Sequence, residues 1–459
     1  MATDDPLDFE LEDRVFKSPA FINKRRFFIG LDDLVNDCLK ENKKQEMKSK
    51  RAKARKNYFS DEDDDVREAK LSECVEKCQQ EMGQISGEEE ICLWGLQVFG
   101  NQKALPQLAF HELGNCRLLQ SFMDNELNSL VELDINKGEV FLERMLVNGW
   151  LWKLLDACGH VEKSIATWTY NLMLYSAQEV LSASACDFWV FILSVKTKVI
   201  WIYIKIDWLP NYSDIRRALE TYGFQSEFQS MFSSNVEMAD ADSDCGGPPQ
   251  NIRAWIMFVA ACVQARKYSI ISAAEAEELI VVLIYLFLDQ KLLGLSLILR
   301  ECMLSAISFF TDNEWSTSSE LVAKSISCRV PKNMNCLRAV ESISGVDARS
   351  KHLRQALAFQ ILVACLDIKA PDAEEVLRFL ISIDVKDKSC DLFKIYIYLV
   401  LTENWLLNNP AFEDKPVIHK LWGVYLRHCS CQITSTDLRT YASKVRCKAS
   451  YILQGTNNK

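Results

Sequence analysis

After about residue 91, apolar side chains recur at steps of three and four residues, the spacing of one face of an α-helix. In one such segment Leu353, Leu357 and Ile361 fall on the same face. The same period predicts helices over 118–133, 140–155, 165–181, 252–263, 273–309, 353–366, 376–383, 392–407 and 438–453. The pattern therefore predicts an all-α fold for this part of the chain.

Helix start signals agree with this prediction. The four-residue patterns that begin at Ser272 and at Thr434 match the capping box, and Pro371 with the acidic residues after it fits a first helical turn. Gly and Pro number only 16 and 10, so few tight turns are available for β-hairpins. The paired helices predict an irregular HEAT-like helical array over 91–459. A loop-like stretch at 233–250 would divide it into two lobes, and 195–208 has the composition of either a strand or a buried helix.

The first 90 residues follow a different pattern, with 17 Lys and Arg and 23 Asp and Glu. Such charge density predicts a mostly disordered arm over 1–90. Within this arm, residues 30–41 carry a short helical stripe with no local core to bury it. We therefore expect a docking helix that binds a groove on another protein through Leu31, Leu34, Val35 and Leu39.

A basic run, KSKRAKARK, follows at 48–56. It is a candidate nuclear-import signal formed by Lys48, Lys50, Arg51, Lys53, Arg55 and Lys56. Two alternatives stay open, a solvated linker and a contact with a phosphate backbone, although the acidic run at 61–65 would partly cancel the field that such a contact needs. The net charge of −10 argues against a basic nucleic-acid-binding domain, so any direct DNA contact would need a local patch.

Motifs that carry chemistry are sparse. Neither a phosphate-binding glycine loop nor a nucleophile elbow occurs, and none of the 5 His residues pairs with another at helical spacing. His428, Cys429 and Cys431, with His419 and Cys447 nearby, supply only half of the usual zinc spacing, and buried thiols at a helix end explain them better. We therefore expect a binding protein without catalytic residues, metal, cofactor or small-molecule substrate. An enzyme whose active site cannot be recognised in the sequence stays open as an alternative.

The 17 Cys residues form no disulfide framework, and the acidic N-terminus lacks the order of a signal peptide, so a reducing compartment is expected. The longest apolar run, 279–288, has about half the length of a membrane span. It predicts a buried core helix and no membrane association.

The order of features resembles a known family. A GLDDL-V-x-x-CLKE segment at 30–41 precedes the charged arm, and a helical region follows with Phe141-Leu142, Gly149-Trp150-Leu151, Trp168, Leu172-Met173, Asp207-Trp208-Leu209-Pro210, Ile215, Ala218-Leu219 and Tyr222-Gly223-Phe224. Over roughly residues 29–400 this resembles the coiled-coil SMC-and-element-interacting family. The length and the acidic start most resemble its plant members, the non-SMC-element-six-like subunits.

The resemblance implies a nuclear, non-catalytic subunit that pairs with an element-five-type helical subunit and binds the SMC five/six ATPase. Such a pair regulates or loads the SMC five/six complex on chromatin for homologous recombination, DNA repair and chromosome maintenance. It also implies that residues 91–459 provide the main subunit interface. The alternative is a generic helical-repeat adaptor for another nuclear complex.

Overall fold

The structure, a computed structural model, describes residues 94–106, 113, 116–125, 135–194, 204–225, 249–368, 372–407, 409–412 and 415–456. Contacts along the chain separate two units, Met1–Ser86 and Gly87–Lys459, and every described residue belongs to the second. The predicted docking helix at 30–41, the basic run at 48–56 and nearly all of the expected lobe boundary at 233–250 lie outside the described residues. Those three predictions are therefore untested.

Sixteen α-helices and two short strands form the regular structure of the described residues, which confirms the predicted all-α class. The helices are α4 (Arg117–Met123), α6 (Ile135–Val147), α7 (Trp150–Cys158), α8 (Lys163–Tyr175), α9 (Glu179–Ser194), α10 (Tyr212–Thr221), α11 (Ile252–Gln264), α12 (Ala273–Leu288), α13 (Ser296–Ser308), α14 (Asp312–Ser327), α15 (Met334–Glu341), α16 (Ala348–Leu366), α17 (Ala373–Ser382), α18 (Leu392–Leu406), α19 (Pro416–Cys431) and α20 (Ala442–Thr456). The strands β1 (His160–Val161) and β2 (Lys205–Ile206) pair in parallel. Short 3₁₀ helices are η4 (Arg266–Tyr268), η5 (Gln290–Leu295) and η6 (Pro410–Phe412).

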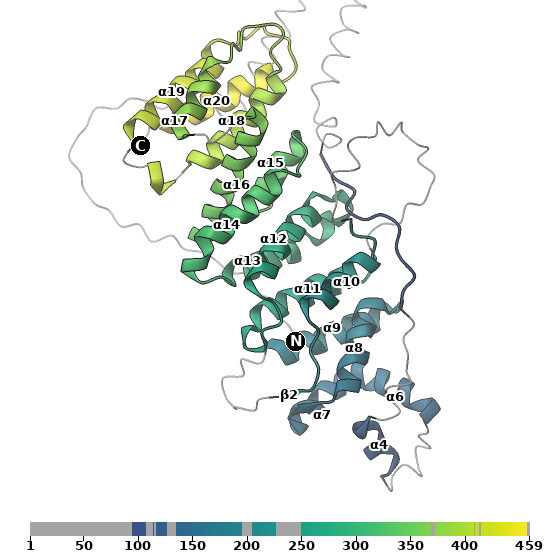
Figure 1. The fold of residues 1–459 in the computed structure, drawn as a ribbon. Helices are drawn as coiled ribbons and strands as arrows, with labels where there is room; N and C mark the ends of the chain where they lie inside the picture. Colours follow the sequence, from purple (N-terminus) through teal and green to yellow (C-terminus); the bar gives the residue numbers. More distant parts are fainter. Residues whose placement is uncertain are drawn as a thin grey trace, which may run out of the picture. The chain divides into compact units, whose positions relative to one another are not determined.

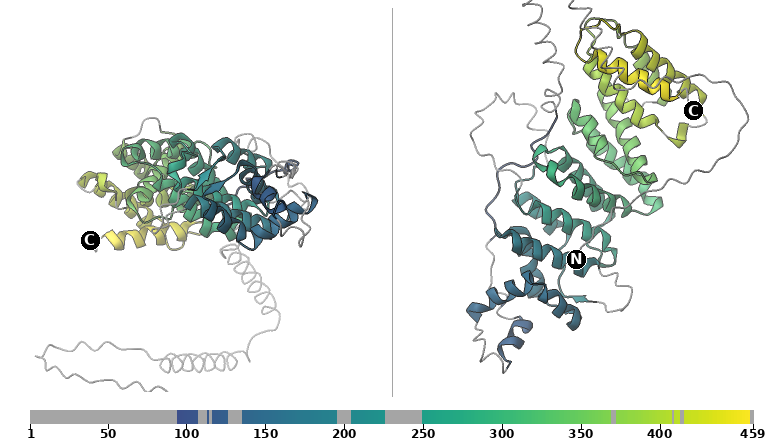
Figure 2. Two further views of the ribbon diagram at one scale, coloured as in Figure 1. Left: turned by 90° about the horizontal axis from the view of Figure 1, so that it is seen from below. Right: turned by 180° about the vertical axis from the view of Figure 1, so that it is seen from behind.

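Within the second unit the helices stack into an array (Figure 1). Helices pack against their neighbours in the chain, as α8 does on α9 and α12 on α13. They also pack against the helix two positions further on, from α9 to α11, α11 to α13, α12 to α14, α14 to α16 and α16 to α18. The array is irregular, because α12 also packs against α15 and α13 against α16. Figure 2 shows the stacked helices from below and from behind.

Three segments that the periodicity predicts as continuous helices are broken. Segment 165–181 is divided between α8, which ends at Tyr175, and α9, which begins at Glu179. Segment 140–155 turns at Gly149, whose φ of 67° suits glycine, and so forms α6 and α7. Segment 273–309 breaks at Asp289 into α12, η5 and α13, because the Asp289 carboxylate accepts the backbone N–H of Lys291 at 2.9 Å. Among the described residues no single helix is long and apolar enough to cross a membrane; Ala273–Leu288 and Gln290–Ser308 pass that test only as a pair, bent by 110°.

The predicted helix starts met different outcomes. Ser272 and Glu275 form the expected capping box at α12. The pattern at Thr434 is wrong as a helix start, because α20 begins only at Ala442. The carboxylate of Asp437 instead binds the Arg439 guanidinium at 2.7 Å, and Leu438, which is 88% exposed, has no core to join. In the ambiguous stretch 195–208, only residues 204–208 are described, and they include β2.

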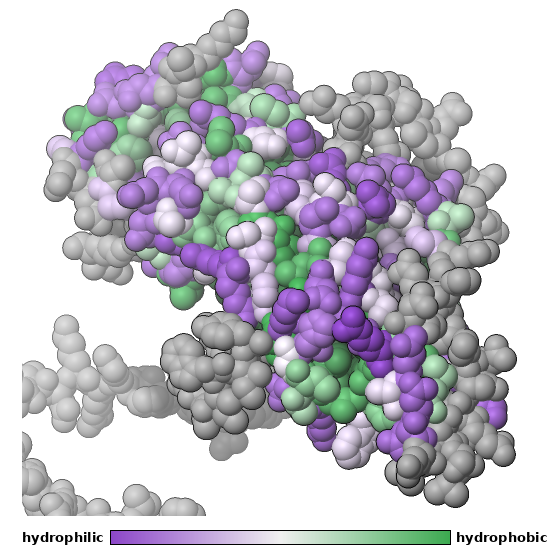
Figure 3. Space-filling model, turned by 60° about the horizontal axis from the view of Figure 1, so that its bottom comes forward, coloured by the Kyte–Doolittle hydropathy of each residue, from purple (hydrophilic) through white to green (hydrophobic). Residues whose placement is uncertain are grey.

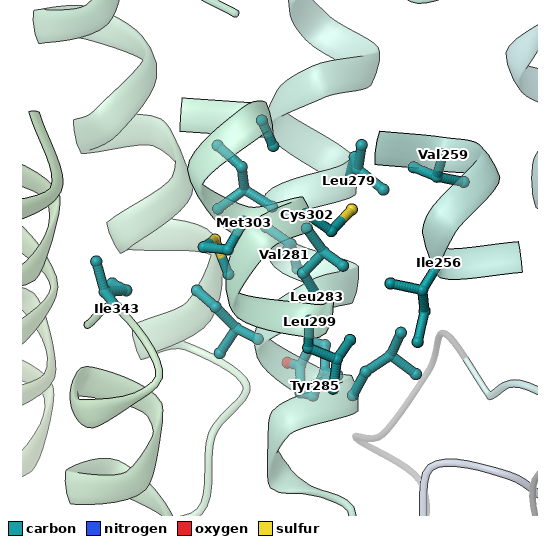
Figure 4. Packing of buried hydrophobic residues seen from close by; sticks show 14 of the residues in the cluster. Ile256, Val259, Leu279, Val281, Leu283, Tyr285, Leu299, Cys302, Met303 and Ile343 are labelled. Atoms are coloured by element: carbon teal, nitrogen blue, oxygen red, sulfur yellow. The ribbon is translucent and has the colours of Figure 1, made fainter. Parts of the chain in front are cut away.

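Apolar side chains from successive helices interlock in the core. Figure 4 shows Ile256 of α11, Leu283 of α12 and Leu299 of α13 within one apolar cluster, all of them almost fully buried. Burial of one such side chain contributes about 1.5–3 kcal/mol to folding. Trp255, also buried, donates its indole N–H to the Ile215 carbonyl at 3.0 Å and so ties α11 to α10.

An extended segment that the periodicity did not predict, 94–103, crosses the ends of three helices; we call it the strap. It starts at α15, where the Gly95 N–H binds the Asn335 side chain at 2.8 Å. It then passes the C-terminal end of α12, where the Leu96 N–H binds the Leu288 carbonyl at 2.8 Å. At α10 the Gly100 N–H binds the Gly223 carbonyl at 2.8 Å. The strap therefore joins helices that are far apart in the sequence.

Candidate interaction surfaces

The residues predicted to bind a partner, Leu31, Leu34, Val35 and Leu39, and the basic residues of the import candidate lie outside the described residues. The search for a site therefore concerns the helical array. Two kinds of feature are relevant there, titratable groups with shifted pKa values and exposed apolar side chains that the fold leaves without a partner.

Most shifted pKa values in the core arise from burial. Desolvation raises the pKa of the Cys302 thiol and that of the Cys186 thiol to about 12, and it also raises that of Cys262. These thiols are therefore protonated at neutral pH and act as small apolar side chains.

The cysteine and histidine residues near the end of α19 do not converge. Burial raises the pKa of Cys429 to about 12, whereas Cys431 and Cys447 are exposed. The ring of His419 instead lies 2.9 Å from the Phe412 carbonyl oxygen. Among the described residues, no three His, Cys, Asp or Glu side chains are placed to hold a metal ion.

A groove lies where the C-terminal ends of α9, α11 and α13 meet. Its volume is about 580 Å³, and its apolar lining includes Leu193, Val263 and Leu304. Two hydrogen bonds hold its walls together: the Gln264 amide donates to the Ser305 hydroxyl at 2.9 Å, and Arg266 donates to the Ser308 carbonyl. The groove is therefore built mainly from helix ends, with residues of η4 at its rim.

The rim of this groove is basic. The Arg266 guanidinium stacks over the Phe309 ring at 5.3 Å, and Lys267 lies 4.5 Å from the centre of the Tyr268 ring. Both cations are exposed beside apolar surface. An apolar floor with a cationic rim favours a segment that is apolar on one side and acidic on its flank.

Exposed leucines also lie along α13 beyond the groove, with the exposed charged residues Arg300 and Glu301 between Leu297 and Leu304. Leu297 is 68% exposed, and Leu304 at the groove is 40% exposed two turns further along the same face. Leu293, in η5, is 54% exposed one turn before Leu297. We call Leu293, Leu297 and Leu304 the α13 stripe. Surface-exposed apolar side chains are also seen between polar bands on the face drawn in Figure 3.

A second exposed apolar group lies at α6 and α7. Val140 and Val147 are seven residues apart on α6 and are 47% and 41% exposed, and Trp150 at the start of α7 is 61% exposed. The Lys153 ammonium stands 5.0 Å from the centre of the Trp150 ring. We regard the α13 stripe as the stronger candidate, because its Leu304 lines a groove.

Neither site was predicted from the sequence. The run from 273 to 309 is so rich in apolar residues that the leucines of the α13 stripe look like core positions. The one local signal is the interruption by Arg300 and Glu301, which marks a solvent-facing side between Leu297 and Leu304.

No family model, no curated protein and no solved structure matches the chain. The functional conclusion therefore rests on the residues themselves, on the geometry of the array and on the resemblance noted above.

Proposed function

We propose that the chain is a non-catalytic nuclear subunit that pairs with an element-five-type helical partner. The pair would regulate the SMC five/six complex, or load it on chromatin, during DNA repair and so maintain genome stability. The SMC five/six complex enters the proposal through the family resemblance over residues 29–400. The observation that carries its mechanism is the groove with the α13 stripe, which suits the docking of an amphipathic helix.

Most residues that carry the resemblance build the fold. Leu142, Leu151, Met173 and Leu219 are buried, and Gly223 adopts a positive φ that favours glycine. The resemblance therefore supports a fold shared with that family, and the shared fold in turn supports a shared partner complex. Trp150 is an exception because it is mainly exposed, so it is available to a partner.

Co-expression with an element-five-type subunit, followed by gel filtration, tests the proposal. We expect one co-eluting complex at micromolar concentration. Two separate peaks would reject the pairing.

Surface variants then locate the contact. Leu297→Asp removes an apolar anchor, and Lys267→Glu reverses a rim charge. Leu438→Asp is the matched control, because Leu438 is 88% exposed and lies outside the groove. Loss of one buried leucine anchor costs about 1.5–3 kcal/mol, so Leu297→Asp should weaken the partner roughly tenfold or more, with unchanged thermal stability. If only Leu438→Asp weakens binding, the groove is not the partner site.

The second candidate function is a helical-repeat adaptor for another nuclear complex. The same groove and stripe would serve it, since neither feature specifies a client. Affinity purification of the full chain with mass spectrometry separates the two, because recovery of SMC five/six subunits supports the first candidate and their absence beside another stable complex supports the second.

A further inference from the structure

Cys336 and Cys365 form a thiol pair that differs from the other buried thiols. Cys336 lies in the first turn of α15 and is 1% exposed, whereas Cys365, in the last turn of α16, is only half-buried. Helices α15 and α16 pack together, and the two thiols are near enough for each to shift the pKa of the other. One thiol is therefore accessible from solvent, and its neighbour is shielded behind it.

The loop before α15 holds this arrangement in place. The Cys336 thiol donates to the Pro331 carbonyl oxygen at 3.0 Å. The next residue, Lys332, donates its ammonium to the carbonyl of Ala364, which directly precedes Cys365. A single loop thus contacts both ends of the pair and brings a cation to Cys365.

Electrostatics divide the two thiols into different roles. The neighbouring Cys336 thiol lowers the pKa of Cys365, and the cations of Lys332 and Lys394 lower it further against burial, which raises it. The same interaction, together with burial, raises the pKa of Cys336. Partial exposure, nearby cations and an adjacent second thiol are the surroundings in which cysteines react with oxidants.

We propose that Cys336 and Cys365 are a peroxide-sensitive modification site that closes reversibly into a disulfide. The Cys365 thiolate attacks hydrogen peroxide; an S–O bond forms, the O–O bond breaks, and the released hydroxide takes up a proton to leave as water. The Cys336 sulfur, after giving up its proton, attacks the Cys365 sulfur; the S–S bond forms, and the hydroxyl leaves with that proton as a second water. The two thiols lose two electrons, and peroxide is reduced to two waters.

The bridge would join the first turn of α15 to the last turn of α16. Two residues close to Cys336 hold the start of the strap: Asn335 accepts the Gly95 N–H at 2.8 Å, and the Arg338 guanidinium lies 4.9 Å from the centre of the Trp94 ring. Oxidation would therefore stiffen the helix to which the strap is attached.

Peptide mapping of the full chain after brief exposure to dilute hydrogen peroxide and alkylation of the remaining thiols tests the proposal. The bridge would link the tryptic peptides 333–338 and 355–369. The control within the same molecule is the pair Cys262 and Cys302, which also interact but are buried without a nearby cation among the causes of their raised pKa values. We expect at least about tenfold more of the 336–365 bridge than of any 262–302 bridge at equal exposure.

Two variants separate the roles. Cys365→Ser should abolish oxidation of Cys336, and Cys336→Ser should leave Cys365 as a sulfenic acid that dimedone labels. The proposal is overturned by equal bridging of the two pairs, by a bridge from Cys365 to a cysteine other than Cys336, or by direct conversion of Cys365 to sulfinic acid in the unaltered chain. All three outcomes are read from the peptide map of the wild-type chain, so the proposal can be rejected even if a variant fails to fold.

Discussion

Gly223→Ala tests whether the strap is a structural element of the array. Gly223 has a φ of +85°, and a Cβ added there would lie 2.6 Å from the Asn101 carbonyl oxygen and 2.8 Å from that of Gly100. A left-handed conformation costs an L-residue about 1–2 kcal/mol, and displacement of tightly packed atoms costs about 1–3 kcal/mol more. Because both contacts are with backbone of the strap, no side chain can rotate away to relieve them. We expect a total loss of about 2–5 kcal/mol.

Hydrogen exchange is the most direct assay, because the strap can detach without unfolding of the whole array. The Gly100 and Lys103 amides, which bind the carbonyls of Gly223 and Thr221, should exchange at least thirtyfold faster if the strap loses about 2 kcal/mol. Gly294→Ala is the matched control, because nothing lies within 4 Å of its added Cβ and no positive φ opposes it. If the Gly100 and Lys103 amides exchange at the same rate in the Gly223→Ala variant as in the Gly294→Ala variant, the strap does not depend on this close approach.

Three further predictions concern stability and localisation. Thr311→Ala should lower the free energy of unfolding by about 1 kcal/mol, because the Thr311 side chain caps α14 through the Glu314 N–H; urea denaturation measures this, with exposed Thr436→Ala as a control near zero. Burial raises the pKa of Asp289, so the folded state holds more protons than the unfolded state between about pH 4 and the raised value, and this residue's contribution to stability falls as pH rises through that window. In Asp289→Asn this contribution should be absent, so the free energy of unfolding should fall less with rising pH than it does in the wild type. An equal pH dependence of the two proteins would show that Asp289 does not cause it. Replacement of Lys50, Arg51, Lys53, Arg55 and Lys56 by Ala should reduce nuclear accumulation of a fluorescent fusion, and unchanged accumulation would reject the import signal.

Local patterns were sufficient for the class of the fold and for several helix boundaries. A period of three and four residues identifies a buried helical face whatever it packs against, as at Leu353, Leu357 and Ile361, which are all buried in α16. A capping box likewise involves residues only three positions apart, so the start of α12 at Ser272 was predictable. The similar pattern at Thr434 failed because Arg439 binds Asp437, and that guanidinium also binds the carbonyls of Val385 and Asp387 in another loop.

The features that matter most for interaction depend on residues far apart in the sequence. The break after α12 is stabilised by the Val98 N–H, which binds the Asp289 carboxylate at 3.3 Å across 191 positions. The groove needs the ends of α9, α11 and α13 side by side, and the thiol pair needs α15 against α16. By itself the sequence determined a helical array with a charged arm, because periodicity and composition are local. The tertiary structure alone decided which leucines stay exposed, which thiols meet and where the strap lies, because these follow from long-range packing.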